Sequence, residues 1–379
     1  MEQWSRSLAG HMGNEQNPNT AVIRKLLRPA LIVSRNTLVE RSTFLGRLLI
    51  GLADESIATT LICPPGYNVE SIVPPPISVL TYPLMDLPVM EYFGVGWLAS
   101  QLAKFKPTVL HGLCENEAAL TCRLARRLDL PYVQTVHSLV GRFGGVRVCP
   151  QRCAAISAPA ETICNHLSQA YPRLADRIRR IHIGTFIEED AICFSDSSRL
   201  ASIVLAQPLR RAADFEPFLR AVKALLAEGH EFLVIIMGSG PAEHRLRRLL
   251  LRLDLSQAVT IVPILDPWRS VLTAGDIFVQ PQPQRAFSTF LLEAMGLGTA
   301  VAACLGGVDD LLIPDQTAVI FDPNDEQSIR QALVRLLGEP DFARRLAKTA
   351  QDRIRADYSV SRMIAATLEM YTQAQQYRD

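Results

Sequence analysis

Short runs of apolar residues alternate with longer stretches of helical spacing along nearly the whole chain. In the first half, this pattern predicts strands at residues 30–33, 59–63, 108–111 and 131–136, and helices at 44–52 and 118–128. Strands that are apolar throughout and separated by helices are typical of a parallel sheet covered on both faces. The first half is therefore predicted to be a doubly wound α/β domain.

The same pattern starts again near residue 200. It predicts strands at 202–205, 232–237, 259–262, 277–279, 301–303 and 318–321, helices at 216–228, 242–253, 268–274 and 289–295, and nearly continuous helix from 327 to 375. A polar stretch from Glu188 to Arg199 lies between the two patterns and suits a linker. The predicted division is a disordered tail at 1–27, Rossmann-like domains at 28–195 and 196–360, and a last helix at 361–379 that can pack back on the first domain.

Composition and charge exclude several classes of protein. The formal net charge is +1, which gives no basic excess for a nucleic-acid partner. No apolar run reaches the roughly 18–20 residues of a membrane-spanning helix, and the polar N-terminus does not resemble a signal peptide. The eight cysteines are scattered, so we expect reduced, mostly buried thiols in a cytoplasmic protein. Cys149 and Cys153 have the spacing of half a metal site, but no second pair follows, and no metal is predicted.

A glycine-rich turn follows the most apolar predicted strand of the second half. Gly238 and Gly240 stand between that strand and the next helix, and Pro241 suits the first turn of a helix. Glycines let the backbone approach a ligand closely, and a helix N-terminus favours an anion such as phosphate. A tight turn without a ligand is the alternative. A nicotinamide-binding fingerprint is disfavoured because it needs Gly or Ala at position 243, where this chain has Glu243.

From about Phe232 to Asp322 the chain resembles the donor domain of the family 4 glycosyltransferases. The residues that carry the resemblance are the turn 238–241, the segment 272–281, the block Phe290-Leu291-Leu292-Glu293-Ala294-Met295-Gly296-Leu297-Gly298 and the loop 305–311. The first half is similar more loosely, through His111 and the segments 134–138 and 181–184. The resemblance implies a GT-B fold, in which two Rossmann-like α/β domains enclose a cleft that binds a nucleotide-sugar and transfers the sugar with retention at the anomeric carbon.

The resemblance also implies roles for particular residues. Glu293 would accept hydrogen bonds from the ribose hydroxyls, and Gly306 and Gly307 would border the donor. His137 would face the sugar near the reacting carbon, although a hydrogen-bonded core histidine explains the same position. The nucleotide-sugar is a substrate, and neither a metal nor another cofactor is expected.

Several expected catalytic residue types are replaced. The family's first glutamate corresponds to Arg285, and the arginine and lysine that clamp the diphosphate correspond to Gln207 and Ala213. The segment 34–38 stands where the family has a pair of glycines. Two interpretations stay open. Either Arg285, with Arg210 or Arg211, stabilises the leaving diphosphate, or the chain is a catalytically inactive pseudo-glycosyltransferase that serves as a scaffold.

The expected activity is therefore hexosyl transfer to a saccharide or lipid-linked acceptor in polysaccharide synthesis. The expected location is the cytoplasm, with peripheral contact at the inner face of a membrane. Two basic segments are candidates for that contact, Ile23–Arg28 and the predicted helix with Arg245, Arg247, Arg248 and Arg252. A solvated helix face explains the second segment as well.

Overall fold

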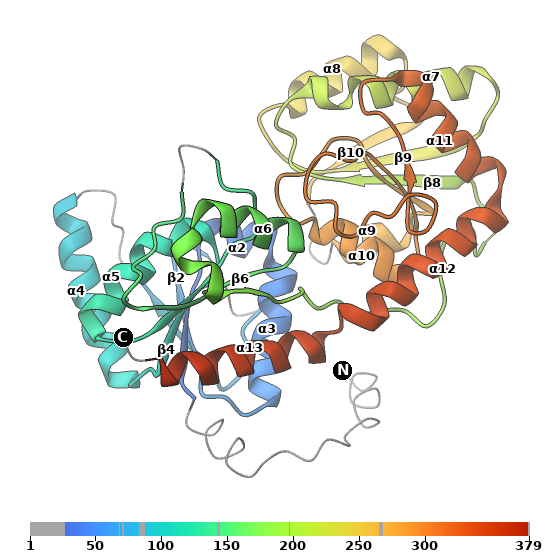
Figure 1. The fold of residues 1–379 in the computed structure, drawn as a ribbon. Coiled ribbons are helices and arrows are strands. Elements are labelled where there is room, and N and C mark those ends of the chain that lie inside the picture. The colour runs from blue at the N-terminus through green and yellow to red at the C-terminus, as the bar shows by residue number, and fades with distance from the viewer. Residues whose placement is uncertain are drawn as a thin grey trace.

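The computed structural model describes residues 27–377, except 68, 70–71, 83–87, 142–144, 197 and 265–267, and leaves out the side chains of 88–92. Apart from Leu27, the predicted tail therefore lies outside the described residues. Two parallel sheets form the described part of the chain, each with helices on both faces (Figure 1). This arrangement confirms the predicted α/β class with two doubly wound units.

The first sheet has the strand order β3-β2-β1-β4-β5-β6-β7. Its central strands are buried along their whole length, which explains why they are apolar throughout. The elements of this half are β1 (Pro29–Ile32), α2 (Arg35–Glu40), α3 (Ser42–Asp54), β2 (Thr60–Cys63), β3 (Ser78–Thr81), α4 (Pro88–Phe105), β4 (Val109–Gly112), η1 (Glu115–Glu117), α5 (Ala118–Leu128), β5 (Tyr132–Thr135), β6 (Cys153–Ala158), α6 (Glu161–Ala170), η2 (Pro172–Arg177) and β7 (Ile178–Arg180).

The second sheet has the strand order β10-β9-β8-β11-β12-β13. Helices α9 and α10 lie on the side that faces the first half, and α7 and α11 lie on the other side (Figure 1). The elements of this half are β8 (Ala201–Ala206), η3 (Ala212–Phe215), α7 (Glu216–Ala227), β9 (Phe232–Met237), α8 (Glu243–Leu253), β10 (Val259–Val262), α9 (Arg269–Thr273), β11 (Ile277–Gln280), α10 (Thr289–Leu297), β12 (Ala300–Ala303), β13 (Val319–Ile320), α11 (Glu326–Gly338) and α12 (Pro340–Asp357).

Local sequence sets the ends of α10, the helix that carries Glu293. The Ser288 side chain accepts a hydrogen bond from the backbone N–H of Leu291 at 3.2 Å, which caps the first turn. Gly298 ends the helix with φ +74°, a left-handed conformation that glycine adopts without strain. The predicted start of α8 needs correction, because the helix begins at Glu243 and Pro241 lies two residues before it.

The chain passes between the two halves twice. It leaves the first half after β7, and α12 leads back to α13 (Val360–Gln376). The two crossings lie together, since Thr185 N donates to Tyr358 O at 2.7 Å. Helix α13 then packs along α3 and against β4, β5 and β6 of the first sheet (Figure 1). The final helix therefore contributes to the core of the first half.

Candidate functional site

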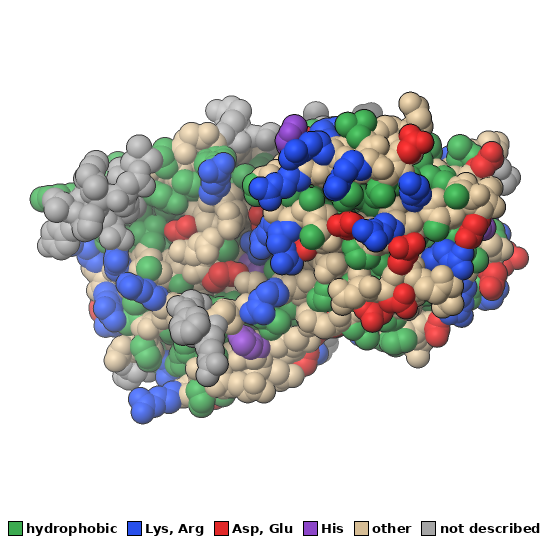
Figure 2. Space-filling model, turned by 90° about the horizontal axis from the view of Figure 1, so that it is seen from above, with side chains coloured by type: hydrophobic (Ala, Val, Ile, Leu, Met, Phe, Trp, Pro, Cys, Tyr) green, Lys and Arg blue, Asp and Glu red, His purple; other side chains and the backbone are tan. Residues whose placement is uncertain are grey.

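The carboxyl ends of the central strands of both sheets meet where the two halves touch. In the second half, the loops after β8, β9, β11 and β12 contact one another, and the loop after β11 also reaches the loop after β5. Seen from above, the molecule is hollowed along the line between the halves, and charged side chains border the hollow (Figure 2). Ligands of doubly wound sheets bind at such strand ends, so this hollow is the candidate site.

Two backbone segments join the halves across this site. Ser138 and Ala286 form an antiparallel bridge, with Leu139 N donating to Arg285 O at 2.7 Å and Phe287 N donating to His137 O at 2.9 Å. The structure therefore brings together the His137 loop and the Arg285 loop, two regions that the sequence assigned to the cleft.

The His137 side chain points into the first half and is almost fully buried. Its Nε2–H donates to Leu113 O at 2.9 Å, and its ring lies edge-on to Phe44. Burial, and then the charge of Arg41, lower the pKa of His137 to about 3, so the ring is neutral near pH 7. With the proton on Nε2, the Nδ1 lone pair has no partner among the described residues. This histidine is fixed like a core residue and still has one free acceptor.

The glutamate Glu115 holds the loop that carries His137. Its carboxylate accepts hydrogen bonds from the backbone N–H of His137 at 3.2 Å and from the hydroxyl of Ser138. Glu115 lies three residues after the end of β4, and His137 lies two residues after the end of β5, so two neighbouring strands supply the contact. The sequence gives no sign of this role, because nothing in a lone glutamate after a strand marks its partner.

The three candidate arginines lie on the surface of the site. Arg285 is exposed, and its Nη2 donates to Leu139 O at 3.2 Å. Arg211 pairs with Asp214, while Arg210 is exposed and makes no ion pair with a described residue. The buried Gln207 accepts a hydrogen bond from Gln284 Nε2 at 3.2 Å, so an amide pair stands where the resemblance places an arginine. The catalytic role of the three arginines stays a prediction.

The glycine turn is in close contact with the loop after β8. A Cβ on Gly238 would lie 2.2 Å from Gln207 O, and one on Gly240 would lie 2.3 Å from Leu209 O. Gly240 also has φ +157°. Both glycines are therefore required by the neighbouring backbone, whether or not a phosphate binds. Phosphate binding at this turn stays a prediction.

The loop after β12 holds a carboxylate on its backbone N–H groups. Asp309 accepts hydrogen bonds from Gly306 N at 2.7 Å and from Gly307 N at 3.0 Å, both at the same oxygen. Its other oxygen is buried and has no partner among the described residues. Successive N–H groups that converge on one point form an anion-binding concavity. In this structure the anion is the protein's own Asp309.

Glu293 is buried, with its side chain 1% exposed, and is bound by groups from both halves. Arg47, on α3, pairs with both carboxylate oxygens, and the second contact, from Nη2 to Oε2, measures 2.9 Å. Thr185 Oγ1 donates to Oε1 at 2.7 Å, and Arg269 Nη1 donates to Oε2 at 2.6 Å. We call these four residues the interdomain clamp. The sequence gives no sign of the role of its two arginines, since a lone arginine on an amphipathic helix usually marks a solvated face.

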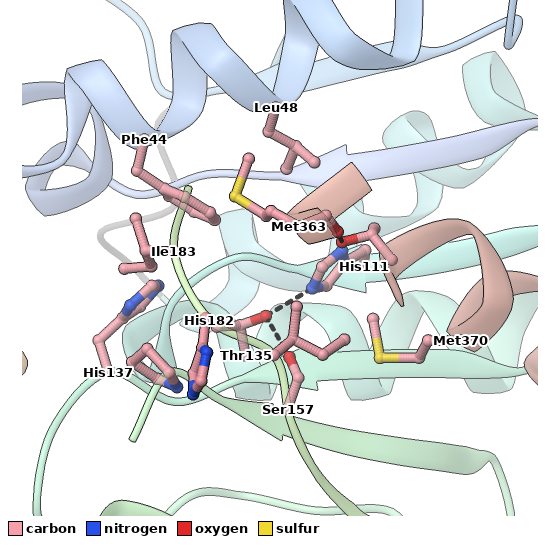
Figure 3. Close-up of a pocket in the computed structure, with 13 residues that line it drawn as sticks. Phe44, Leu48, His111, Thr135, His137, Ser157, His182, Ile183, Met363 and Met370 are labelled. Atoms are coloured by element: carbon pink, nitrogen blue, oxygen red, sulfur yellow. Dashed lines mark hydrogen bonds between the residues drawn. The ribbon is translucent and has the colours of Figure 1, made fainter. Parts of the chain in front are cut away.

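A small cavity of about 20 Å³ lies beside His137, between α3, the ends of β4–β6 and α13. One wall is polar, because His111 Nε2, Thr135 Oγ1 and Ser157 Oγ follow one another at 2.7 Å spacings (Figure 3). Met363 and Met370 of α13 line it from another side. Its volume suits a single water molecule.

His111 forms part of this buried chain. Its Nδ1 lies 2.7 Å from the hydroxyl of Tyr371 on α13. Burial, and then the charge of His137, lower the pKa of His111 to about 3. Both ring nitrogens are used within the protein, so His111 is a structural residue that attaches α13 to the first sheet.

Neither a cluster of metal ligands nor a membrane-crossing helix is found in the part of the chain that the structure describes. No group of three or more His, Cys, Asp or Glu side chains is arranged to hold a metal there. All eight cysteines are free thiols and buried, including Cys149 and Cys153. Among the same residues, no helix combines the length and the apolar character that crossing a membrane requires.

Comparison with known proteins gives two family matches. Residues 42–185 match the model described as a glycosyl transferase 4-like domain, and residues 203–339 match the model of glycosyl transferases group 1. The α-D-kanosaminyltransferase of Streptomyces kanamyceticus is 28% identical over 149 residues, which are 38% of this chain and 39% of that protein. The lipopolysaccharide core biosynthesis mannosyltransferase LpcC of Rhizobium leguminosarum bv. viciae is 26% identical over 163 residues, 41% and 46% of the two chains. The matched region thus spans less than half the length of these curated relatives.

Solved structures are similar over nearly the whole chain. A glycosyltransferase from Rickettsia africae superposes with a TM-score of 0.75 at 14% identity, covering 92% of this chain and 98% of that one. HepE from Anabaena, solved in complex with UDP and glucose, gives 0.75 at 14% identity, covering 90% and 98%. A sucrose-phosphate synthase from Thermosynechococcus elongatus gives 0.74 at 18% identity, covering 92% and 98%. At these identities the likeness establishes the fold.

Proposed function

Because the chain belongs to the group 1, glycosyltransferase 4-like family and has its GT-B fold, as its sequence predicted, we propose that it is a retaining glycosyltransferase. It moves a sugar from a nucleotide diphosphate sugar to a saccharide or lipid-linked acceptor. The donor lies over the loops after β8, β9, β11 and β12, and the acceptor approaches from the first half.

The observation that carries this proposal is the direct pairing of segment 137–139 with segment 285–287. Transfer requires the sugar and the acceptor to be held in a fixed geometry, which lowers the entropic cost of bringing them together. A backbone bridge between the two halves, at the strand ends of both sheets, provides that geometry. The His137 side chain lies next to this bridge, and its buried Nδ1 can accept a hydrogen bond from a sugar hydroxyl once the surrounding side chains move apart.

Stabilisation of the leaving diphosphate is the next requirement, since charge develops on its oxygens as the bond to the sugar breaks. In this proposal the exposed cations Arg285 and Arg210 supply that stabilisation. The N–H groups of Gly306 and Gly307 add to it once Asp309 releases them. Guanidinium groups suit the task, because they bind phosphate with two parallel hydrogen bonds.

A pseudo-glycosyltransferase is the second candidate, and one observation favours it. The carboxylate of Glu293, the expected ribose ligand, is already hydrogen-bonded to Arg47, Thr185 and Arg269. A chain in which these contacts never open would keep the fold and serve as a binding partner in polysaccharide or glycoconjugate synthesis.

Calorimetric titration with UDP, GDP, ADP and their glucose and mannose conjugates separates the two candidates. A glycosyltransferase binds one of them with micromolar strength, and Glu293→Gln removes that binding. Arg285→Glu weakens the binding of a nucleoside diphosphate more than the binding of the free nucleoside, because the substitution reverses a charge beside the diphosphate. Glu339→Gln, at an exposed position at the start of α12, is the control and leaves binding unchanged. Absence of binding at millimolar nucleotide, with the fold intact, would refute the transferase.

Peripheral contact with a membrane belongs to the same proposal. On α8, Arg245, Arg248 and Arg252 are exposed, while Arg247 pairs with Glu243. The other basic segment, Ile23–Arg28, lies mostly outside the described residues. The cytoplasmic location expected from the sequence stays a prediction.

A further inference from the structure

The carboxylate of Glu293 has no acceptor position left for a ligand. Oε1 accepts from Arg47 Nη1 and Thr185 Oγ1, and Oε2 accepts from Arg47 Nη2 and Arg269 Nη1. A carboxylate offers about four lone-pair sites. All of them are therefore used by protein donors, and the side chain is 1% exposed.

These donors come from three different parts of the chain. Arg47 lies on α3 in the first half, Thr185 lies in the first crossing, and Arg269 lies on α9 in the second half. Arg47 is itself buried, donates to Gly184 O at 3.0 Å, and lies over the Phe186 ring at 4.9 Å. Opening the two halves at this point must separate Arg47 from Glu293. The structure shows the clamp closed, and an open clamp would be one in which Arg47 and Glu293 are apart.

We propose that the interdomain clamp and the ribose of the donor compete for Glu293, so that a nucleotide binds only to molecules whose clamp has opened. The inference rests on the proposed function, in which Glu293 is the ribose ligand. A ribose hydroxyl donates its proton to a carboxylate lone pair, and in the closed clamp the protein uses every one. Removing Arg47 frees one site on each oxygen and leaves Thr185 and Arg269 to orient the carboxylate.

The apparent affinity of a ligand falls by the fraction of molecules that can bind it. If the open state is a minor state of about 0.1–10%, removing Arg47 tightens nucleotide binding by about 10- to 1000-fold. The test is calorimetric titration of UDP, GDP and ADP into the full-length protein and into Arg47→Ala. Arg269→Gln is a second variant with the same expected direction, at a side chain that is 22% exposed and so less critical for folding.

Arg199→Ala is the matched control. Arg199 forms a similar two-bond pair with the buried Asp276, at 2.7 and 2.8 Å, at the opposite end of β11 from the site. The Arg199→Ala variant should leave the nucleotide affinity unchanged. In the double variant Arg47→Ala/Glu293→Gln, the gain in affinity should disappear. Thermal unfolding of each variant verifies that it is folded.

The outcomes separate the inference from the proposed function. Tighter binding in Arg47→Ala than in a parent protein that binds supports competition for Glu293. Binding in this variant alone also supports the competition, and it assigns the parent protein to the pseudo-glycosyltransferase. Unchanged or weaker binding in folded Arg47→Ala and Arg269→Gln, with the parent protein binding normally, overturns the competition and leaves the transferase standing. If neither the parent nor a folded variant binds any of the three nucleotides at millimolar concentration, the donor site is absent and both proposals fall.

Discussion

Removing the hydroxyl of Tyr371 should weaken the attachment of α13 to the first half. This hydroxyl lies 2.7 Å from His111 Nδ1, and both side chains are buried. Tyr371→Phe keeps the ring and leaves that nitrogen without its partner. A buried polar group that loses its partner costs about 1–3 kcal/mol, and we expect about 2 kcal/mol here.

The assay is equilibrium unfolding in urea, followed by far-ultraviolet circular dichroism, with hydrogen exchange of the α13 amides as a local probe. A loss of about 2 kcal/mol lowers the urea midpoint by roughly 1 M or less for a slope near 2–3 kcal/mol/M. The α13 amides should exchange faster than those of α11, because only α13 depends on the lost contact. Tyr377→Phe is the matched control, since Tyr377 directly follows α13 and its hydroxyl donates an exposed hydrogen bond of 3.4 Å to Pro150 O.

One result would refute this reasoning. If Tyr371→Phe is as stable as Tyr377→Phe, the hydroxyl is not needed to satisfy His111. A double variant adds a sharper criterion. Replacing both partners, as in Tyr371→Phe/His111→Leu, should cost less than the sum of the single changes, because no unpaired nitrogen remains.

Three further predictions concern stability. Gly238→Ala should cost about 1–3 kcal/mol in urea unfolding, because its Cβ would lie 2.2 Å from a backbone oxygen, whereas Gly338→Ala meets nothing within 4 Å and should be neutral. Ser288→Ala should cost about 1 kcal/mol through loss of the α10 cap, and Ser288→Thr should restore most of it; equal stability of all three proteins would contradict the capping role. Burial lowers the pKa of His111 and His137 to about 3, below the unfolded value near 6.5, so their contribution to stability is complete above pH 6.5 and lost as the pH falls toward 3. Between pH 6 and 4, each histidine should therefore change the free energy of unfolding by about 1.4 kcal/mol per pH unit. Urea unfolding over this pH range should show that His137→Gln reduces the slope by that amount. An unchanged slope would show that His137 is protonated in the folded protein.

The sequence predicted most of the second half because its strands are short, apolar and separated by strongly amphipathic helices. Strands β9 (Phe232–Met237) and β10 (Val259–Val262) begin and end at the predicted residues. The pattern of apolar residues predicted neither β3 nor α4. Strand β3 is an exposed edge strand, and the apolar residues of α4 are spread around the helix in sequence, so no period of 3.6 stands out.

The site was predictable only in part. The sequence pointed to Glu293, Gly306 and His137 as candidates because they follow strands or lie in recognisable blocks. The contacts that now define them were not, since Arg47 and Glu293 are 246 residues apart. Pairing across such a separation depends on how the two halves pack, and no local period or spacing encodes that packing.

The return of α13 to the first half has a consequence for synthesis. A ribosome releases the chain from its N-terminus, yet buried side chains of the first half, including Ile364, Leu368 and Tyr371, emerge only after the whole second half. The second half, complete by residue 357, can fold while the first still lacks one wall. The first half, although N-terminal, is therefore the half whose core is completed last. A fragment ending near residue 195 should expose an apolar groove along α3 and need assistance to stay in solution.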